Sequence, residues 1–191
     1  IKNLNFTFKS GTADGAFIYS LKNSQAFNTY GYTHNVTVAD CNFDGAGSVS
    51  FRAVRCPAKG SAKNIILINV TAKNLFGLAE FRGTIDITIQ NCTATENMLY
   101  GVQISGGYGT HQIENNEFVA TATGAYGIVV QDACSADITY KNNTITADRA
   151  LVFKATQSPQ DNYVASGIYN GTLEHTGANK LYISGVTFGS E

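Results

Sequence analysis

The sequence predicts an all-β protein, a parallel β-helix of about eight coils with an Asn ladder. Two observations predict this fold: one motif recurs along the whole chain, and a second set of short alternating segments lies between its copies. The composition agrees, because 19 of the 191 residues are Gly, only two are Pro and none is Trp. Such a composition is typical of strands and turns, and no segment shows a helical period.

The first motif reads apolar-x-apolar-x-Asn-x-x-apolar, as in "NVTVADCNF" at 35–43 and "DITIQNCTA" at 86–94. Its Asn position, here called the slot, is filled in turn by Asn3, Asp40, Asn69, Asn91, Asn115, Asn142, Asn170 and Gly185. Most successive slots lie 22 to 29 residues apart, by subtraction of these numbers. A repeat of this length that contains short strands and a fixed Asn predicts one coil of a solenoid.

The apolar residue that ends each copy is expected to point inward. A single coil cannot bury its apolar face, so equivalent positions stack on neighbouring coils at about 4.8 Å, the spacing of hydrogen-bonded strands. The predicted inward column is Phe6, Phe43, Ala72, Ala94, Phe118, Ile145, Leu173 and Phe188.

The second repeat consists of short segments that alternate in polarity and are therefore predicted to be strands. They are "AFIYS" at 16, "SVSFR" at 48, "LAEFR" at 78, "GVQIS" at 101, "GIVVQ" at 127 and "ALVFK" at 150. Aligning them predicts an inward column of Tyr19, Phe51, Phe81, Ile104, Val130 and Phe153. Tyr100 and Tyr126, just before two of these strands, are expected in the core.

Over residues 1–188 the chain resembles the pectin-lyase-like superfamily of right-handed parallel β-helices, on the motif copies quoted above. The resemblance implies one right-handed domain over 1–191, with the slot at the second-turn ladder of that superfamily. An open first coil and a weak last coil indicate a fragment of a longer chain. The alternative fold, an antiparallel sandwich, would not need Asn at one fixed slot.

The resemblance also implies that the first strand of each coil forms the floor of the substrate site. The outward positions of these strands carry polar and charged residues, which we expect to bind substrate: Arg52, Arg82, Gln103, Ser105, Gln131 and Lys154, with Glu80 among them. Guanidinium groups suit sugar carboxylates, and amides and hydroxyls suit sugar hydroxyls. The alternative is that Arg52, Glu80 and Arg82 form only a solvated ion-pair network of little energetic value.

A catalytic role is predicted for Glu80 and Asp132, because glycoside hydrolysis usually needs two carboxylates. "VVQDA" at 129–133 resembles half of a polygalacturonase Gln-Asp-Asp signature, but Ala133 replaces the second Asp. The sequence has no His-Gly or Arg-Ile-Lys counterpart, which argues against a pectinase. If the protein is an enzyme, we expect a glycoside hydrolase or a polysaccharide lyase.

The four cysteines are expected to be buried or turn thiols rather than disulfides. Cys41 and Cys92 share an inward column but lie two coils apart, about 10 Å, which is too far for a bridge. No Cys or His pair has metal-ligand spacing, so neither a metal nor a cofactor is expected. The balance of 13 basic and 14 acidic residues argues against a nucleic-acid partner, and no apolar run is long enough for membrane insertion.

The function favoured by these observations is binding of a host cell-surface polysaccharide, with depolymerisation where carboxylates pair. In its Gly, Asn and Thr usage the chain resembles phage tailspike or tail-fibre segments. That resemblance implies a homotrimer on the virion tail or at a cell surface. In "NIILINV" at 64–70, Ile66 and Ile68 take outward positions, which predicts a covered face. The alternatives are a stand-alone polysaccharide lyase, hydrolase or epimerase, and a structural rod or adhesin segment without catalysis.

Overall fold

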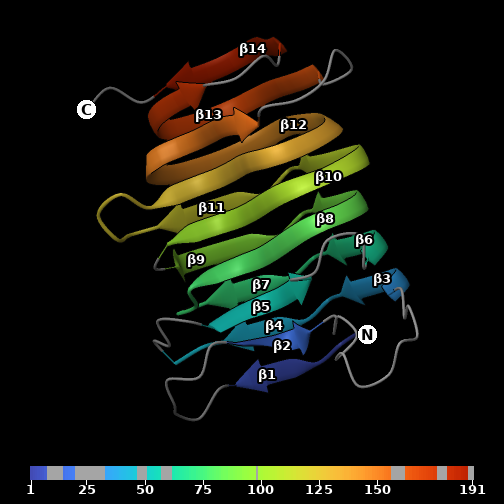
Figure 1. Cartoon of the computed structure of the whole chain (residues 1–191). Coiled ribbons are helices and arrows are strands. Elements are labelled where there is room, and N and C mark those ends of the chain that lie inside the picture. The colour runs from blue at the N-terminus through green and yellow to red at the C-terminus, as the bar shows by residue number, and fades with distance from the viewer. Residues whose placement is uncertain are drawn as a thin grey trace.

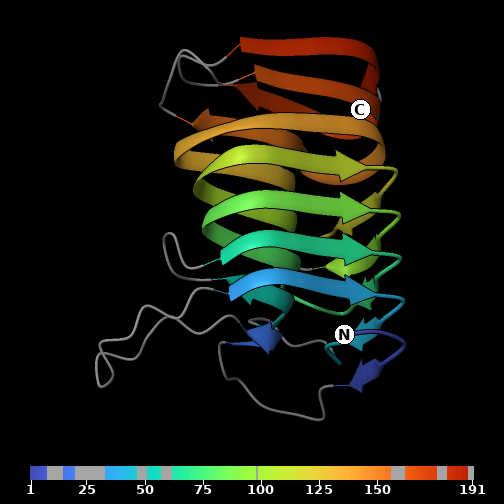
Figure 2. The ribbon, with the colours of Figure 1, turned by 90° about the vertical axis from the view of Figure 1, so that its right-hand side faces the viewer.

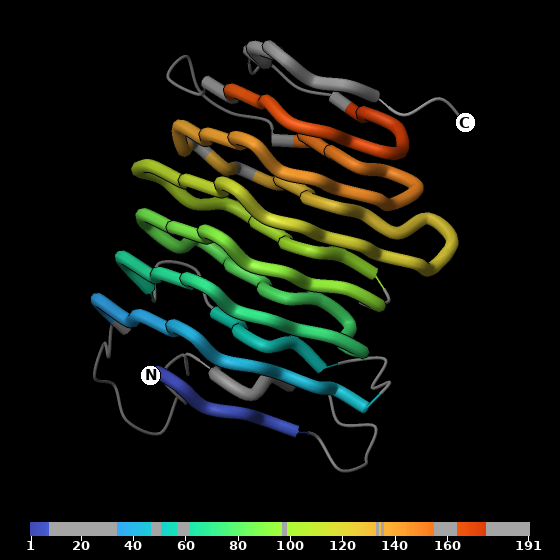
Figure 3. Tube along the Cα trace, turned by 180° about the vertical axis from the view of Figure 1, so that it is seen from behind, coloured from blue at the N-terminus to red at the C-terminus, as the bar shows by residue number. Residues whose placement is uncertain are grey.

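The structure, a computed structural model, describes residues 1–7, 15–19, 33–46, 51–56, 62–97, 99–155, 162–175 and 180–188. Figure 3 shows the successive coils from behind. The beginning of the predicted strand at 48, residues 48–50, lies outside the described residues, as do the side chains of Tyr19 and Phe188. Every strand pairing within the described part is parallel. The predicted all-β parallel β-helix is therefore confirmed.

The strands stack along one axis from the N-terminal end to the C-terminal end (Figures 1 and 2). Their pairings form three walls. The first wall contains β1 (Asn5–Thr7), β4 (Asn42–Asp44), β7 (Thr71–Lys73), β9 (Thr93–Asn97) and β11 (Glu117–Ala120). The second wall begins with β2 (Gly15–Tyr19) and β5 (Phe51–Cys56), and the third with β3 (Thr33–Ala39) and β6 (Ala62–Ile68).

Long strands run through more than one wall. β8 (Gly77–Gln90) pairs with β5 through its first half and with β6 through its second half. The next long strands are β10 (Tyr100–Glu114), β12 (Tyr126–Ala155), β13 (Asn162–His175) and β14 (Lys180–Phe188). Because each of them bends around the core, they appear as wrapped ribbons in Figure 2.

The inward column of the first wall follows the predicted register over most of its length. Phe6 pairs with Phe43, and the two rings stack with centroids 4.8 Å apart. The column continues through Ala72, Ala94, Phe118 and Ile145.

Leu173 was wrongly predicted as the next member of this column. Tyr169 pairs with Ile145 instead, and Leu173 pairs with Leu151. Tyr169 is completely buried whereas Leu173 is only partly buried, so this register buries the larger side chain. Asn170 therefore lies opposite Thr146 rather than in the slot after Asn142.

The predicted alignment of β5 is also wrong, by five residues. The sequence repeat places Phe51 beside Phe81, but in the structure Cys56 pairs with Phe81 and Arg55 pairs with Glu80. This register buries Val54 and Cys56 in the core and leaves Phe51 packed at its margin. Phe81, Ile104 and Val130 of the second wall pair as predicted and are fully buried. Phe153, the last predicted member of this column, is also buried.

In the middle coils the residue that follows the slot is buried. Cys41, Cys92, Asn116 and Asn143 occupy this position and are all buried. All four cysteines of the chain are buried thiols, as predicted.

Candidate functional site

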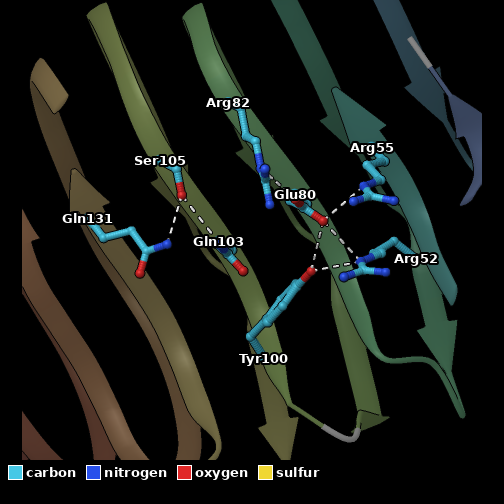
Figure 4. A network of polar contacts seen from close by, with 8 residues as sticks. All are labelled: Arg52, Arg55, Glu80, Arg82, Tyr100, Gln103, Ser105 and Gln131. Atoms are coloured by element: carbon cyan, nitrogen blue, oxygen red, sulfur yellow. Dashed lines mark hydrogen bonds and ion pairs between the residues drawn. The ribbon is translucent and has the colours of Figure 1, made fainter. Parts of the chain in front are cut away.

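The outward side of the second wall holds a group of interacting polar side chains from four strands (Figure 4). At its centre Glu80 of β8 is surrounded by three guanidinium groups and one phenol. We call Arg52, Arg55, Glu80, Arg82 and Tyr100 the Arg–Glu cluster.

Both carboxylate oxygens of Glu80 are occupied. Oε1 accepts a hydrogen bond of 2.8 Å from Nε of Arg82. Oε2 lies 3.1 Å from Nε of Arg52 and 3.0 Å from Nε of Arg55. Glu80 is only 1% exposed, so its charge is balanced by these cations rather than by solvent.

Tyr100 links the cluster from the neighbouring strand. Its hydroxyl accepts a 2.8 Å hydrogen bond from Nε of Arg52 and donates to Oε2 of Glu80 at 3.4 Å. Burial raises the pKa of Tyr100, which keeps the hydroxyl protonated and able to donate. Tyr100 is buried, as predicted, and its hydroxyl takes part in the polar network with Arg52 and Glu80.

Aromatic rings hold Arg52 in place. Its guanidinium carbon lies 4.4 Å from the ring centroid of Phe76 and 6.0 Å from that of Tyr100. A Cβ atom at Gly77 would collide with the Tyr100 ring, so the Gly allows the ring to lie over β8. These contacts help to offset the lost hydration of the Arg52 side chain, which is only 10% exposed.

A second set of polar residues runs across the strands beside the cluster. Arg82, Ser105 and Gln131 are register neighbours on β8, β10 and β12, and we call them the polar row. Oγ of Ser105 accepts hydrogen bonds from Nε2 of Gln131 at 3.0 Å and from Nε2 of Gln103 at 3.3 Å. Gln103 is itself the register neighbour of Glu80.

The structure thus gathers most of the predicted binding residues, but it places Lys154 elsewhere. Nζ of Lys154 forms an ion pair of 3.1 Å with Glu174, which also lies 3.5 Å from Nη1 of Arg149. Arg149 in turn stacks on Tyr126, 4.2 Å from the ring centroid. Lys154 therefore belongs to a separate ion-pair group on β12 and β13.

Asp132 is exposed and, among the described residues, makes no hydrogen bond or ion pair. It lies two strands from Glu80 and three residues beyond the register position of Glu80. Strand spacing and rise place the two Cα atoms about 14 Å apart.

The predicted outward column that contains Glu80 and Gln103 continues through Val129 and Val152, and it is more buried than the sequence indicates. Val129 is the register neighbour of Gln103, yet it is only 3% exposed, and Val152 is fully buried. Polar groups that a ligand could contact are therefore concentrated at Arg82, which has a side chain that is 47% exposed, and at the partly exposed Gln103 and Gln131, whereas Ser105 is only 5% exposed.

Sequence reasoning missed Arg55. The five-residue error in aligning β5 left Arg55 beyond the predicted strand. The alternation of buried Val54 and Cys56 around it was the signal that could have identified it.

The chemistry that this arrangement supports is binding through hydrogen bonds and charge. Both oxygens of Glu80 are held by cations, so neither is presented to a glycosidic bond. The role of Glu80 and Asp132 as a catalytic pair remains a prediction, which a product-release assay would test. Among the described residues there is no group of three or more His, Cys, Asp or Glu side chains placed to hold a metal ion. In the same part of the chain, no helix has the length and apolar character needed to cross a membrane.

Comparison with known proteins agrees with this fold. Residues 5–188 match the family model described as a right-handed beta helix region. No curated protein and no solved structure matches the chain. Because the matched residues cover nearly the whole sequence, the chain belongs to this family of right-handed β-helices.

Proposed function

We propose that this right-handed β-helix binds a host cell-surface polysaccharide and is a segment of a phage tailspike or tail fibre. In this proposal it acts as a homotrimer on the virion tail or at a cell surface. The glycan lies along the outward side of the second wall, over the first halves of β8 and β10 and the beginning of β12.

The observation that carries the proposal is the polar row. Arg82, Ser105 and Gln131 repeat on consecutive parallel strands, about 4.8 Å apart. A linear polymer with repeated polar groups is a natural ligand for such a row. Arg82 offers guanidinium donors and Gln131 an amide, and both suit groups on sugars.

A homotrimer is supported by apolar side chains on the third wall. Tyr108 is 50% exposed and Val164 is 41% exposed. Ile66, Ile68 and Ile85 on the same wall are partly exposed. Large exposed apolar side chains on one wall favour a subunit contact. We expect Ile66→Asp to lower the mass measured by light scattering to that of a monomer.

The binding proposal is tested by retention of a panel of capsular and O-antigen polysaccharides in affinity electrophoresis. We expect one polymer to be retained by the native protein and lost by Arg82→Ala and Gln131→Ala. Lys73→Ala is the matched control, because Lys73 is an exposed cation on the first wall, paired with Asp44 at 3.3 Å. Equal loss in the control would indicate non-specific charge binding, and retention of no polymer would refute the proposal. A reducing-end assay of the same mixtures, with Glu80→Gln and Asp132→Asn, tests depolymerisation.

A structural rod is the second candidate function, and the Arg–Glu cluster favours it. Arg52 and Glu80 are buried and satisfied by each other and by Tyr100, as expected for a network that holds coils together. If the protein is a structural rod, we expect Arg52→Ala to lower the free energy of unfolding and we expect no variant to change glycan retention.

We also propose the finer architecture, about eight coils joined by an Asn ladder at the slot. It is supported by hydrogen bonds from Nδ2 of Asn69 to Oδ1 of Asp40 at 2.9 Å and from Nδ2 of Asn142 to Oδ1 of Asn115 at 3.2 Å. All four residues have φ between 52° and 57°, a conformation that Asn and Asp tolerate. We expect Asn69→Ala to destabilise the protein more than Asn69→Gly, as measured by urea unfolding.

A further inference from the structure

We propose that Arg82 and Ser105 form a subsite for an anionic group of the glycan, a carboxylate or a sulfate ester. In this proposal Glu80 is the positioning residue that orients Arg82. The inference rests on the proposed polysaccharide binding and specifies the chemical class of the polymer.

Arg82 is the member of the Arg–Glu cluster that can reach a ligand. Its side chain is 47% exposed, whereas the side chains of Arg52 and Arg55 are 10% and 12% exposed. Within the described residues its Nε bonds to Glu80, and neither of its terminal amino groups has a partner. Two parallel N–H groups of one guanidinium match the two oxygens of a carboxylate or a sulfate.

Glu80 fixes the direction of that guanidinium. It is itself held on its other oxygen by two buried arginines, so it cannot turn away from the cluster. Arg82 extends from β8 toward this anchored carboxylate (Figure 4). A side chain that is ordered before binding loses less conformational entropy when the ligand arrives.

Ser105 supplies a second donor beside Arg82. Its oxygen already accepts from Gln103 and Gln131, which uses both lone pairs. Ser105 is only 5% exposed, so the hydroxyl proton is the one group that it can offer to a ligand at the surface. Because Arg82 and Ser105 present donors alone, the best-matched ligand group is one that only accepts, namely an oxyanion. A neutral sugar hydroxyl would leave its own proton without a partner.

The test measures retention by matched polymers that differ only in charge. Hyaluronan is compared with carboxyl-reduced hyaluronan, and dextran sulfate with dextran, in affinity electrophoresis at several salt concentrations. We expect an anionic polymer to be retained and its neutral counterpart to be released. The polymer that is retained identifies the oxyanion as carboxylate or sulfate.

Arg82→Lys distinguishes recognition through the geometry of the guanidinium group from attraction by positive charge alone. It keeps the positive charge and removes the guanidinium fork, so we expect retention to weaken about tenfold or more. Ser105→Ala is expected to weaken it as well, and Lys73→Ala is expected to have no effect. Glu80→Gln adds one net positive charge, and a mere cationic patch would then bind anions more tightly. The proposal predicts the opposite, weaker binding.

The outcomes separate the two proposals. If neutral and anionic polymers are retained equally and Arg82→Lys binds as well as the native protein, polysaccharide binding stands and the oxyanion subsite is overturned. If no polymer in either pair is retained, both are overturned. If Glu80→Gln does not fold, Arg82→Lys and Ser105→Ala still decide the result.

Discussion

Asn116 and Asn143 are bonded to each other inside the coil. Nδ2 of Asn116 donates to Oδ1 of Asn143 at 3.0 Å, and the same oxygen accepts from the Asn116 backbone N–H at 3.1 Å. Asn116 also bonds to the backbone of Cys92 and Ile89, and Asn143 bonds to the carbonyl of Ile113. Two buried amides are thus satisfied by backbone groups of adjacent coils, which ties those coils together.

We predict that Asn116→Ala lowers the free energy of unfolding by at least about 2 kcal/mol, because it leaves buried backbone groups without partners. Urea unfolding measures the change. Asn42→Ala is the matched control, since Nδ2 of Asn42 donates to Oδ1 of Asn5 at 2.7 Å in an exposed pair. We expect the control to change stability by no more than about 0.5 kcal/mol. Equal losses in the two variants would contradict a special role for the buried pair.

Asp132 has φ of 63° and follows Gln131. In the same way Gly83 follows Arg82 and Gly106 follows Ser105, with φ of 61° and 63°. Asp132 therefore occupies a backbone position that Gly occupies in the two preceding coils. We predict that Asp132→Gly leaves stability unchanged or raises it by up to about 1 kcal/mol, and that Asp132→Ala lowers it by about 1 kcal/mol. Thermal unfolding measures both changes. If Asp132→Gly is stable but no longer releases product from a polysaccharide, Asp132 has a catalytic role. If Asp132→Gly is instead less stable than the native protein, the Asp132 side chain stabilises the turn, which contradicts this prediction.

The cysteine thiols are predicted to be inert in the folded protein. All four are buried, and burial raises the pKa of Cys92 to about 11. At pH 8 roughly one part in a thousand of that thiol is then ionised, and only the thiolate reacts. We expect no reaction of the native protein with a thiol-specific disulfide reagent over minutes, and reaction of four thiols after unfolding in urea. Rapid reaction of even one thiol in the native protein would contradict the buried placement.

The sequence was sufficient for the architecture because a solenoid repeats its inward positions. The column from Phe6 to Ile145 follows directly from the motif, since each copy must stack on the next. The register failed at β5 and at Tyr169, where the loops before the strands differ in length and more than one apolar residue could point inward. Packing decides such cases, and a single chain does not reveal packing.

The site was predictable only in part for the same reason. Gln103, Ser105 and Gln131 lie on strands of correct register and meet as expected. Arg55 was missed, and the burial of Glu80 was not foreseen, because both depend on the register of β5 relative to β8. The alternation of side chains shows which residues face outward but does not show what covers them.

His111 makes the stability of the protein dependent on pH. It is completely buried in β10, and burial lowers its pKa to about 4 from a usual value of 6.5. The unfolded chain therefore binds a proton at higher pH than the folded protein does. The contribution of the neutral buried imidazole to the free energy of unfolding is therefore fully present above pH 6.5. It is lost as pH falls toward 4, and the loss is about 3 kcal/mol at most. Urea unfolding between pH 7.5 and 4.5 measures this loss.

We expect His111→Leu to flatten the pH dependence of the free energy of unfolding in that window. We expect His34→Gln, a change at an exposed side chain, to preserve it. An unchanged slope in His111→Leu would show that other groups cause the acid sensitivity.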